Sequence, residues 1–393
     1  MAMRNPVKDK VAIVGVGSTG FRRNIEGRSR DSLAVEASIK AIRDSGLRRE
    51  DIDGISASSP APPYMASALG LPSVTHYRSG HVPFVFAIVD AMNAVFSGSA
   101  ECVLLYHSVY RAPAISASAA RDPFRRGLGF GGSIPQVPSR TDPESVEGAV
   151  GYAAWASRYL HEYNASREGF ARVAISDRSN AADNPLAAVR DPMTMDDYYA
   201  ARMVREPLCL FDMDVPVDGA DAFVITTADR ARDLPNQPVL IHAATAGLTD
   251  RNEEDQIPGL GRHGQHVVVE SLRAKSDISI PDVDLYFPYD GFTIITLSWI
   301  ENTGWCGPGE AGDFLKQHWD EQRHRILING KIPVNPHGGA LSEGGTQGSG
   351  HIREAVVQLR GDAGARQAPG VTTALLTPGG FFFNAQGLVL RTD

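Results

Sequence analysis

An α/β fold built from two similar halves is the fold class that this sequence predicts. Short runs rich in β-branched residues alternate along the chain with segments whose apolar residues recur at helical spacing. The motif Ser-Gly-His occurs at residues 79–81 and again at 349–351. Each copy opens a helical segment that ends at a glycine and precedes a strand. We therefore expect two strand–helix–strand halves related by a pseudo-twofold axis, with both helix N-termini directed at one site.

The first half is expected to begin with a buried strand over Lys10–Val16, a β-branched run that ends beside a glycine. Asp31 or Ser32 can cap the next helix, and Gly46 can end it. Later elements of this half are a strand at 73–77, a helix from about Pro83 to Ser97, a strand at 102–106, a helical pair at about 150–163 and 168–182, and a strand at 222–227.

The second half repeats this alternation. Its expected elements are strands at 238–243, 284–287 and 372–376, and helices at about 291–302 and 350–360. The length of 393 residues calls for two domains or fused halves, which we place at residues 1–235 and 236–393. Residues 111–150 are rich in Ser, Pro, Gly and Arg without periodicity, so an inserted loop region on top of the sheet is expected there.

Composition excludes several classes of function. The hydrophobic fraction of 42% and the charged fraction of 21% are typical of a soluble globular protein. The net charge of 38 − 46 = −8 argues against binding of nucleic acid or an anionic membrane by the whole molecule. No apolar run reaches the ~18 residues of a membrane span, and no signal-peptide core is present, so a cytoplasmic location is expected. The three cysteines are far apart in the sequence, which predicts neither a metal site nor a disulfide framework.

Residues 335–351, Asn-Pro-His-Gly-Gly-Ala-Leu-Ser-Glu-Gly-Gly-Thr-Gln-Gly-Ser-Gly-His, are the best candidate for a chemical site. Such a density of glycine lets the backbone approach a ligand and adopt positive φ angles. The histidines, the glutamate and the asparagine can move protons or hold a polar ligand. The stretch leads into a helical segment, so a site at a helix entrance is expected. A flexible, glycine-rich surface loop is the alternative.

A second glycine motif, Gly15-Val-Gly17-Ser-Thr-Gly20, fits the dinucleotide-binding fingerprint and follows a strand. In that fingerprint, however, a helix opens within the motif. Residues 21–30 are polar and lack helical periodicity, and no second strand ending in an acidic residue follows at the required distance. Nicotinamide binding is therefore disfavoured.

With the order of elements established, the chain resembles the thiolase superfamily and its sterol-carrier/lipid-transfer branch. The resemblance extends over nearly the whole chain and implies a five-layer αβαβα fold and a homodimer. The matching segments are Lys10–Gly17, Asp44–Asp53, Ala91–Leu105, Val217–Ala222, Tyr289–Phe292, Asn335–His351 and Glu354–Gly361.

The chain departs from thiolases at all four of their usual catalytic identities. The nucleophilic cysteine falls at or next to His81, and no cysteine occurs before residue 102. The histidine of the thiolase Gly-His-Pro turn corresponds to Gly345, the second cysteine to Thr377, and the asparagine of the Asn-Glu-Ala-Phe element to Tyr289. Acyl transfer through a cysteinyl thioester is therefore not expected.

A cleft of this kind can still break a carbon–carbon bond without a nucleophile. In retro-aldol cleavage, a base takes the hydroxyl proton of a β-hydroxyacyl thioester, and the departing enolate needs hydrogen-bond donors and a proton. The chain is most similar to the thiolase-like aldolases that cut oxidised steroid side chains from their CoA esters. That resemblance implies a CoA thioester as substrate, no covalently bound cofactor, and a small partner protein with a zinc ribbon and an OB-fold.

The candidate catalytic residues on this hypothesis are Tyr289, Asp290, His337, Glu343, His351 and His81. The candidate substrate-binding residues are Gly338, Gly339, Gly379, Gly380, Arg125 and Arg126.

Each candidate has a role and an alternative. Tyr289 is expected to exchange a proton at the β-oxygen, unless it is a core tyrosine. His337, Glu343 and His351 can act as base, proton donor or orienting group, or can simply hydrogen-bond within the loop. Neutral His81 at a helix N-terminus can donate to the thioester oxygen.

The remaining candidates would bind rather than react. The backbone N–H groups near Gly379 and Gly380 can serve as oxyanion donors. Arg125 and Arg126, with Arg121, can contact a phosphate or form a solvated charge cluster. Some relatives carry another tyrosine in the glycine turn, where this chain has Gly344-Gly345, which leaves the second acid–base group open.

Two other functions remain open at this point. The protein can be a non-catalytic carrier of lipid or acyl-CoA that keeps the fold and has lost the chemistry. It can also be an acyl-CoA acyltransferase, in which case a cysteine would become acylated. Cys102, Cys209 and Cys306 are expected to be packing residues instead.

Overall fold

The computed structural model describes residues 5–23, 25, 27–57, 59–80, 84–111, 149–252, 257–381 and 384–393. Most of the predicted inserted region, residues 112–148, lies outside this part. So do three candidate site residues, His81, Arg125 and Arg126.

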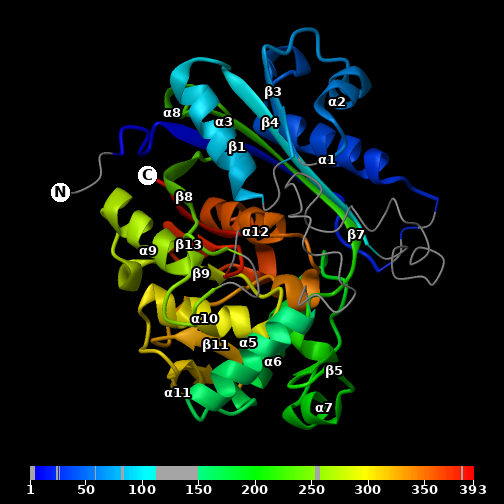
Figure 1. Cartoon of the computed structure of the whole chain (residues 1–393). Helices are drawn as coiled ribbons and strands as arrows, with labels where there is room; N and C mark the ends of the chain where they lie inside the picture. Colours follow the sequence, from blue (N-terminus) through cyan, green and yellow to red (C-terminus); the bar gives the residue numbers. More distant parts are fainter. Residues whose placement is uncertain are drawn as a thin grey trace.

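One nine-stranded mixed sheet runs through the molecule in the order β3-β2-β4-β7-β1-β8-β14-β13-β9 (Figure 1). Its N-terminal strands are β1 (Val11–Ser18), β2 (Gly54–Ala57), β3 (His76–Ser79), β4 (Cys102–Tyr110) and β7 (Asp218–Thr227). Its C-terminal strands are β8 (Val239–Gly247), β9 (Leu285–Pro288), β13 (Thr373–Thr377) and β14 (Ala385–Arg391). The two parts join where β1 and β8 pair antiparallel.

The two parts of the sheet follow one plan when they are read outward from the β1–β8 pair. In the N-terminal part, β1 is antiparallel to β7, β7 is antiparallel to β4, and β4 is parallel to β2. In the C-terminal part, β8 is antiparallel to β14, β14 is antiparallel to β13, and β13 is parallel to β9. Beyond β2 lies parallel β3, and beyond β9 lies Val334 in a parallel bridge with Tyr286. The prediction of two related halves is confirmed.

Helices form three layers around the two parts of the sheet (Figure 1). Helix α1 (Arg30–Ser45) packs on the outer face of the N-terminal strands. Helices α3 (Val85–Ser97) and α12 (Ser349–Arg360) share one core with strands of both parts. The opposite face of the C-terminal strands is covered by α5 (Ala149–Glu162), α6 (Glu168–Ala181), α9 (Gly264–Lys275) and α10 (Thr293–Thr303). This helix–sheet–helix–sheet–helix order is the expected five-layer arrangement.

The close packing of β1 against α1 explains the glycines of the dinucleotide-like motif. A Cβ atom on Gly15 would lie 2.3 Å from the Ala41 oxygen, and one on Gly17 would lie 2.2 Å from the Ala37 oxygen. The strand continues through the motif, and the helix opens only at Arg30. The helix cap is Ser29, whose hydroxyl accepts from the Ser32 N–H at 3.1 Å, so the prediction of Asp31 or Ser32 as the cap was wrong.

Several shorter elements complete the fold. The helices are α2 (Pro62–Leu69), α7 (Met195–Ala200), α8 (Ala228–Ala231) and α11 (Ala311–Gln317), with single 3-10 turns at Arg49–Asp51, Leu210–Asp212, Ile280–Asp282 and Gly364–Arg366 and a π-helical turn at Gly339–Glu343. The strands are β5 (Met203–Arg205) with β6 (Leu208–Cys209), and β10 (Trp319–Asp320), β11 (Arg325–Ile328) and β12 (Ile332–Pro333). None of the described helices is both long and apolar enough to cross a membrane.

Candidate active site

The candidate groups meet where two parallel strands end. Strand β9 leads into Tyr289-Asp290-Gly291, and its neighbour β13 leads into Pro378-Gly379. The Tyr289 N–H donates to the Thr377 oxygen at 3.1 Å and so joins the two strand ends. The Asn335 side chain, at the start of the glycine-rich turn, donates to the Pro288 oxygen at 3.0 Å. In α/β sheets, this edge is where ligands commonly bind.

The glycine-rich turn is part of the interior. Every residue from 335 to 351 is buried except Gln347, which is partly exposed, so the alternative of a flexible surface loop is wrong. Gly338 and Gly339 have φ angles of 99° and 58°, and a Cβ on Gly339 would lie 2.0 Å from Asp290 Oδ2. Glycine is needed there because the backbone passes directly over the carboxylate. The contact explains this glycine without a ligand, and a substrate-binding role for Gly338 and Gly339 stays a prediction.

His351 and Asp290 form a buried imidazole–carboxylate dyad. His351 Nε2 lies 2.9 Å from Asp290 Oδ1, while the Leu341 N–H donates to Asp290 Oδ2 at 2.9 Å. Burial alone would raise the pKa of Asp290, but the hydrogen bond and charge of His351 outweigh it, and the net pKa is lowered. The carboxylate therefore holds the proton on Nε2, and Nδ1 has no partner among the described residues. The dyad has the geometry of an oriented general base.

Asp177, on α6, interacts with the Asp290 carboxylate of this dyad. Its pKa is raised well above the ordinary value, first by burial and then by the negative charge of Asp290. We therefore assign the shared proton to Asp177, which donates a hydrogen bond to Asp290. This hydrogen bond contributes to the lowered pKa of Asp290. Two carboxyl groups so close cannot both ionise, and this pair separates into one acid and one carboxylate.

His337 lies beside the dyad and is neutral. Its ring centroid is 4.7 Å from that of His351, with the rings at 76° to each other. Its pKa is lowered well below the ordinary value, first by burial, then by the positive charge that His351 carries when both of its nitrogens are protonated, and then by the charge of Arg353. Neither of its ring nitrogens is hydrogen-bonded within the described part of the chain. A buried, unpaired imidazole at this position can accept or donate a proton once a substrate is bound.

Glu343 belongs to a structural network. It accepts from Arg353 Nη2 at 2.5 Å and from Asn184 Nδ2 at 2.7 Å, and His337 Nε2 is 4.0 Å away. Arg353 also pairs with Asp221 of β7 at 3.3 Å. Burial raises the pKa of Glu343, and the charge of Arg353 opposes that shift. These contacts favour hydrogen bonding within the loop over a direct catalytic role for Glu343.

Tyr289 faces the dyad as a neutral phenol. Its ring centroid is 5.8 Å from that of His351, and no described residue is hydrogen-bonded to its hydroxyl. Burial, followed by the negative charge of Asp214, raises the pKa of Tyr289 far above the ordinary value for tyrosine. The hydroxyl is therefore a proton donor rather than a phenolate base.

The late glycine pair is only partly available as an oxyanion site. The Gly379 N–H donates to the Thr377 oxygen at 2.9 Å, and its own oxygen accepts from Trp299 Nε1 at 2.5 Å. The Gly380 N–H has no acceptor in the described part of the chain and is the donor that remains. A Cβ on Gly380 would lie 2.5 Å from the Tyr152 hydroxyl, so the backbone runs close to that side chain.

The structure brings together four predicted residues, namely Tyr289, Asp290, His337 and His351. Sequence reasoning missed Asp177, Arg111 and Asp214, which come from α6, the end of β4 and the segment before β7. Arg111 and Asp214 form a two-point ion pair next to Gly345, with nitrogen–oxygen distances of 2.5 and 3.1 Å. Only Arg111 had a positional signal in the sequence, because it is the first residue of the predicted inserted region.

The cysteines are placed as packing residues. Cys102 and Cys209 are buried and Cys306 is partly buried. Burial raises the pKa of all three thiols, to about 11 for Cys209 and about 12 for Cys306, so each stays protonated near neutral pH. None of the three is an activated nucleophile.

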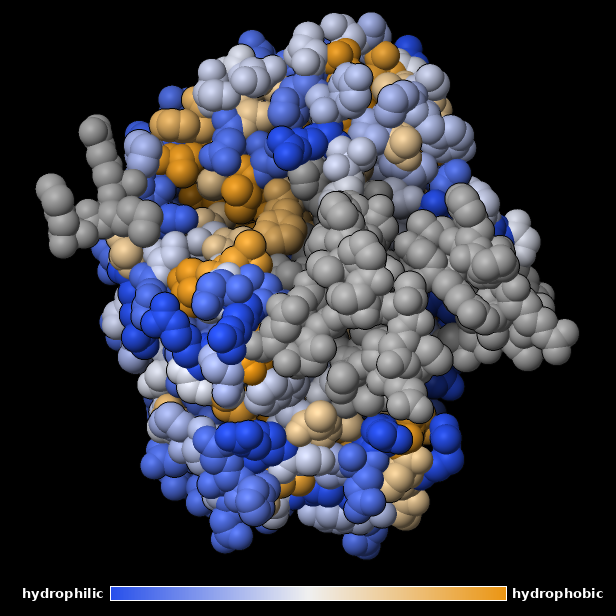
Figure 2. Space-filling view, viewed as in Figure 1, coloured by the Kyte–Doolittle hydropathy of each residue, from blue (hydrophilic) through white to orange (hydrophobic). Residues whose placement is uncertain are grey.

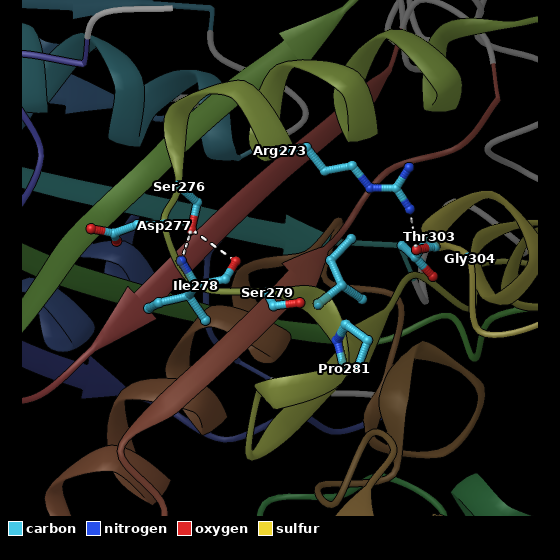
Figure 3. A pocket seen from close by; sticks show the side chains of 9 residues that line it. Arg273, Ser276, Asp277, Ile278, Ser279, Pro281, Thr303 and Gly304 are labelled. Atoms are coloured by element: carbon cyan, nitrogen blue, oxygen red, sulfur yellow. Dashed lines mark hydrogen bonds between the residues drawn. The ribbon is translucent and has the colours of Figure 1, made fainter. Parts of the chain in front are cut away.

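A separate cavity of about 310 Å³ lies near the start of strand β9, at the other end of the strand from the candidate site (Figure 3). Its lining includes residues 276–281, which precede β9, whereas the site follows β9. Arg273 donates to the Thr303 oxygen at 2.9 Å, and the Ser276 hydroxyl donates to the Ile278 oxygen at 3.2 Å (Figure 3). These polar groups are paired within the protein, so the cavity adds nothing to the chemistry of the site.

Comparison with known proteins agrees with this description. Residues 258–392 match the family model described as Thiolase C-terminal domain-like. The chain is 33% identical to 17-hydroxy-3-oxo-4-pregnene-20-carboxyl-CoA lyase of Mycobacterium tuberculosis, over 94% of this chain and 96% of that one. It is 34% identical to the steroid side-chain-cleaving aldolase of Thermomonospora curvata, over 97% and 98% of the two chains.

Solved structures extend the comparison. The Ltp2-ChsH2(DUF35) aldolase superposes with a TM-score of 0.83 at 32% identity, covering 98% of this chain and 99% of that one. Human mitochondrial 3-ketoacyl-CoA thiolase in complex with CoA superposes with a TM-score of 0.66 at 15% identity, over 98% of both chains, and shows the fold alone. The chain therefore belongs to the thiolase-like aldolases, the carbon–carbon lyases of the thiolase superfamily.

Proposed function

We propose that this lyase cleaves a β-hydroxyacyl-CoA with a bulky, steroid-type side chain by a retro-aldol reaction, through acid–base groups alone. The observation that carries the proposal is the His351–Asp290 dyad: Nδ1 of His351 has no partner among the described residues, and its ring centroid lies 5.8 Å from that of Tyr289. The names of the Mycobacterium tuberculosis lyase and the Thermomonospora curvata aldolase describe cleavage of this kind of substrate.

The reaction can be assigned to residues in three proton transfers. His351 Nδ1 takes the β-hydroxyl proton, the Cα–Cβ bond breaks, and the hydroxyl carbon leaves as a ketone or aldehyde. The electron pair stays on the thioester as an enolate, which accepts hydrogen bonds from the Gly380 N–H and neutral His337. Tyr289 protonates the α-carbon, and the imidazolium of His351 returns a proton to the phenolate. The balance is closed, because one proton leaves an oxygen and one reaches a carbon.

The same proposal names the binding partners. CoA is part of the substrate, and we propose no covalently bound cofactor. After cleavage, CoA carries a shorter acyl chain. The solved relative is a complex of two proteins, which supports a small zinc-ribbon and OB-fold partner for this chain. Exposed Tyr199, Met203, Val204 and Leu210 form an apolar patch on α7, the β5–β6 hairpin and the turn after it, at the lower right of Figure 2, that could contact it.

We also propose an oligomeric state and a cellular location. Strand β3 lies at the open edge of the sheet with Tyr77 64% exposed, which supports a homodimer that pairs this edge. A cytoplasmic location is consistent with a CoA ester as substrate.

The test is turnover by the full chain with its partner protein. Incubated with a β-hydroxyacyl-CoA, the wild type should release a shorter acyl-CoA and a ketone or aldehyde. Tyr289→Phe removes the donor and should lower kcat by about 10²–10⁴-fold. Tyr64→Phe, at an exposed site, is the matched control and should retain full activity. Saturable CoA-ester binding without turnover, unaffected by Tyr289→Phe, would instead identify a carrier.

A further inference from the structure

The space beside Gly345 is filled by an ion pair. A Cβ atom on Gly345 would lie 2.2 Å from Asp214 Oδ2 and 2.3 Å from Arg111 Nη1. The glycine is thus required by close contact with the pair, and the turn has no empty space at this position. By resemblance, Gly345 corresponds to the catalytic histidine of thiolases. In this chain, a guanidinium and a carboxylate occupy the place where that side chain would extend.

The pair joins four segments of the site. Arg111 donates to both oxygens of Asp214, and Nη1 is 3.5 Å from the Gly345 oxygen. The Asp214 N–H donates to the Gly291 oxygen at 3.0 Å, and the Gly345 N–H donates to the Val215 oxygen at 2.8 Å. The end of β4, the segment before β7, the glycine turn and the Tyr289–Gly291 loop are therefore held in one arrangement. Two-point pairing fixes the direction as well as the distance of the charges.

Tyr289 lies against the segment that the pair holds. A Cβ on Gly291 would lie 2.6 Å from Tyr289 Cε1 and 3.0 Å from its hydroxyl. The ring therefore lies over Gly291, whose oxygen accepts from the Asp214 N–H. The charged and titratable groups that act on Tyr289 are Asp214, Arg111, Asp290 and His351. After burial, Asp214 is the largest cause of its raised pKa, and Arg111 opposes it.

We propose that Arg111 and Asp214 are a positioning pair for Tyr289, which hold its hydroxyl directed at the substrate; this inference rests on the proposed function. The pair is only partly buried, with side-chain exposures of 30% for Arg111 and 13% for Asp214. An ion pair so placed adds little net stability, because desolvation offsets much of the attraction. Its contribution is the charge it places beside Tyr289 and the position it gives to Gly291.

Asp214→Asn tests this role directly. Loss of the carboxylate removes the two-point contact with Arg111, so the Tyr289 ring should lose its fixed position against Gly291. The NMR signals of ring-labelled Tyr289 are identified by their absence from Tyr289→Phe, and they should shift and broaden in Asp214→Asn relative to wild type. This readout needs no turnover. If the wild type fails to cleave any β-hydroxyacyl-CoA, the proposed function fails while the NMR signals still decide the role of the pair.

The kinetic counterpart compares kcat with KM. Because Tyr289 must be directed at the substrate for catalysis, kcat should be about tenfold lower in Asp214→Asn, with KM nearly unchanged. Gly345→Ala, whose methyl group would displace the pair, should reproduce the effect. Arg111→Lys keeps the charge but loses the two-point contact, so it should retain more activity than Arg111→Gln.

Two control variants and a folding check accompany these tests. Gly312→Ala, whose Cβ would lie 4.0 Å from its nearest neighbour, and Asp183→Asn, from the ion pair with Arg325, should behave as wild type. Circular dichroism confirms folding, and Arg111→Lys replaces Asp214→Asn if the latter does not fold. Unchanged Tyr289 NMR signals together with an unchanged kcat, in folded Asp214→Asn and Gly345→Ala, would overturn the proposal.

Discussion

Helices α3 and α12 occupy equivalent places in the two halves and both bury apolar residues, but only α12 also buries polar ones. Both lie in the core between the two parts of the sheet, and both end at a glycine with positive φ, 75° at Gly98 and 80° at Gly361. The buried residues of α3 are all apolar: Val85, Ala87, Ile88, Ala91, Met92, Ala94 and Val95. The buried polar residues of α12 are Ser349, His351, Arg353, Glu354 and Gln358.

The difference shows that one structural plan can serve packing in one half and chemistry in the other. Polar groups are costly to bury unless each is paired, and α12 meets that condition through partners from several elements. His351 pairs with Asp290 after β9, while Arg353 pairs with Asp221 of β7 in the other half. The N-terminal half thus supplies counter-charges such as Asp221, and the C-terminal half carries most of the residues that we propose to react.

The largest expected effect comes from removing the base on α12. His351→Asn keeps a side chain of similar polarity but removes the imidazole, and Asp290 loses its partner. We expect kcat for cleavage of a β-hydroxyacyl-CoA to fall by about 10²–10⁴-fold. Steady-state kinetics of product release measures this change.

The matched change on α3 is Ile88→Val, at a fully buried position of the packing helix. It should lower the free energy of unfolding by about 0.5–1.5 kcal/mol and leave kcat unchanged. Equal losses of kcat in the two variants would show that the two helices do not differ in function.

The second prediction concerns stability. Arg353→Met leaves Glu343 and Asp221 as buried carboxylates without their cation, since Arg353 is 3% exposed and contacts both. We expect the free energy of unfolding, measured by urea titration, to fall by about 3–5 kcal/mol. Adding Glu343→Gln should recover part of the lost unfolding free energy, because it removes one of the two buried, unpaired carboxylates. A loss below about 1 kcal/mol would mean that the network is not needed for folding.

Much of the fold followed from local patterns in the sequence. Glycine stops located the ends of α1, α3 and α12, and β-branched runs located β1, β4 and β7. Helix α2 was missed because its Ser-, Pro- and Ala-rich sequence suggests a loop, although prolines in a first helical turn, as at Pro62 and Pro63, were a usable signal. The π-helical turn at Gly339–Glu343 was also missed, because its shape depends on the approach of Asp290 rather than on its own sequence.

The candidate site was predictable only where its residues lie near one another in the sequence or follow a strand. His337 and His351 lie in one glycine-rich stretch, and Tyr289 with Asp290 follows a predicted strand. Asp214 reaches Arg111 across 103 positions of the sequence, and no local pattern indicates that pairing. Asp177 lies within a helix whose other buried residues gave no hint of chemistry. Contacts of this kind depend on tertiary packing, which one sequence does not reveal.

The smallest expected effect tests whether a histidine in each half is held neutral. Burial lowers the pKa of His107, on β4, to about 4, and that of His337 falls well below its ordinary value. In both cases, the unfolded chain binds a proton below about pH 6.5 that the native state does not. The stabilising contribution of each histidine is therefore complete above that pH and declines as the pH falls, by roughly 1.4 kcal/mol per pH unit.

Unfolding by urea at neutral pH and at about pH 5 measures this decline. Across that interval, His337→Gln and His107→Gln should each reduce the acid-induced loss of stability by about 2 kcal/mol relative to wild type. Equal reductions would show that the two halves bury their histidines alike, and that His337 differs from His107 only in lying beside the reacting groups. An acid-induced loss in His337→Gln as large as in wild type would mean that this imidazole is already protonated in the native protein, which would remove it as a neutral donor to the enolate.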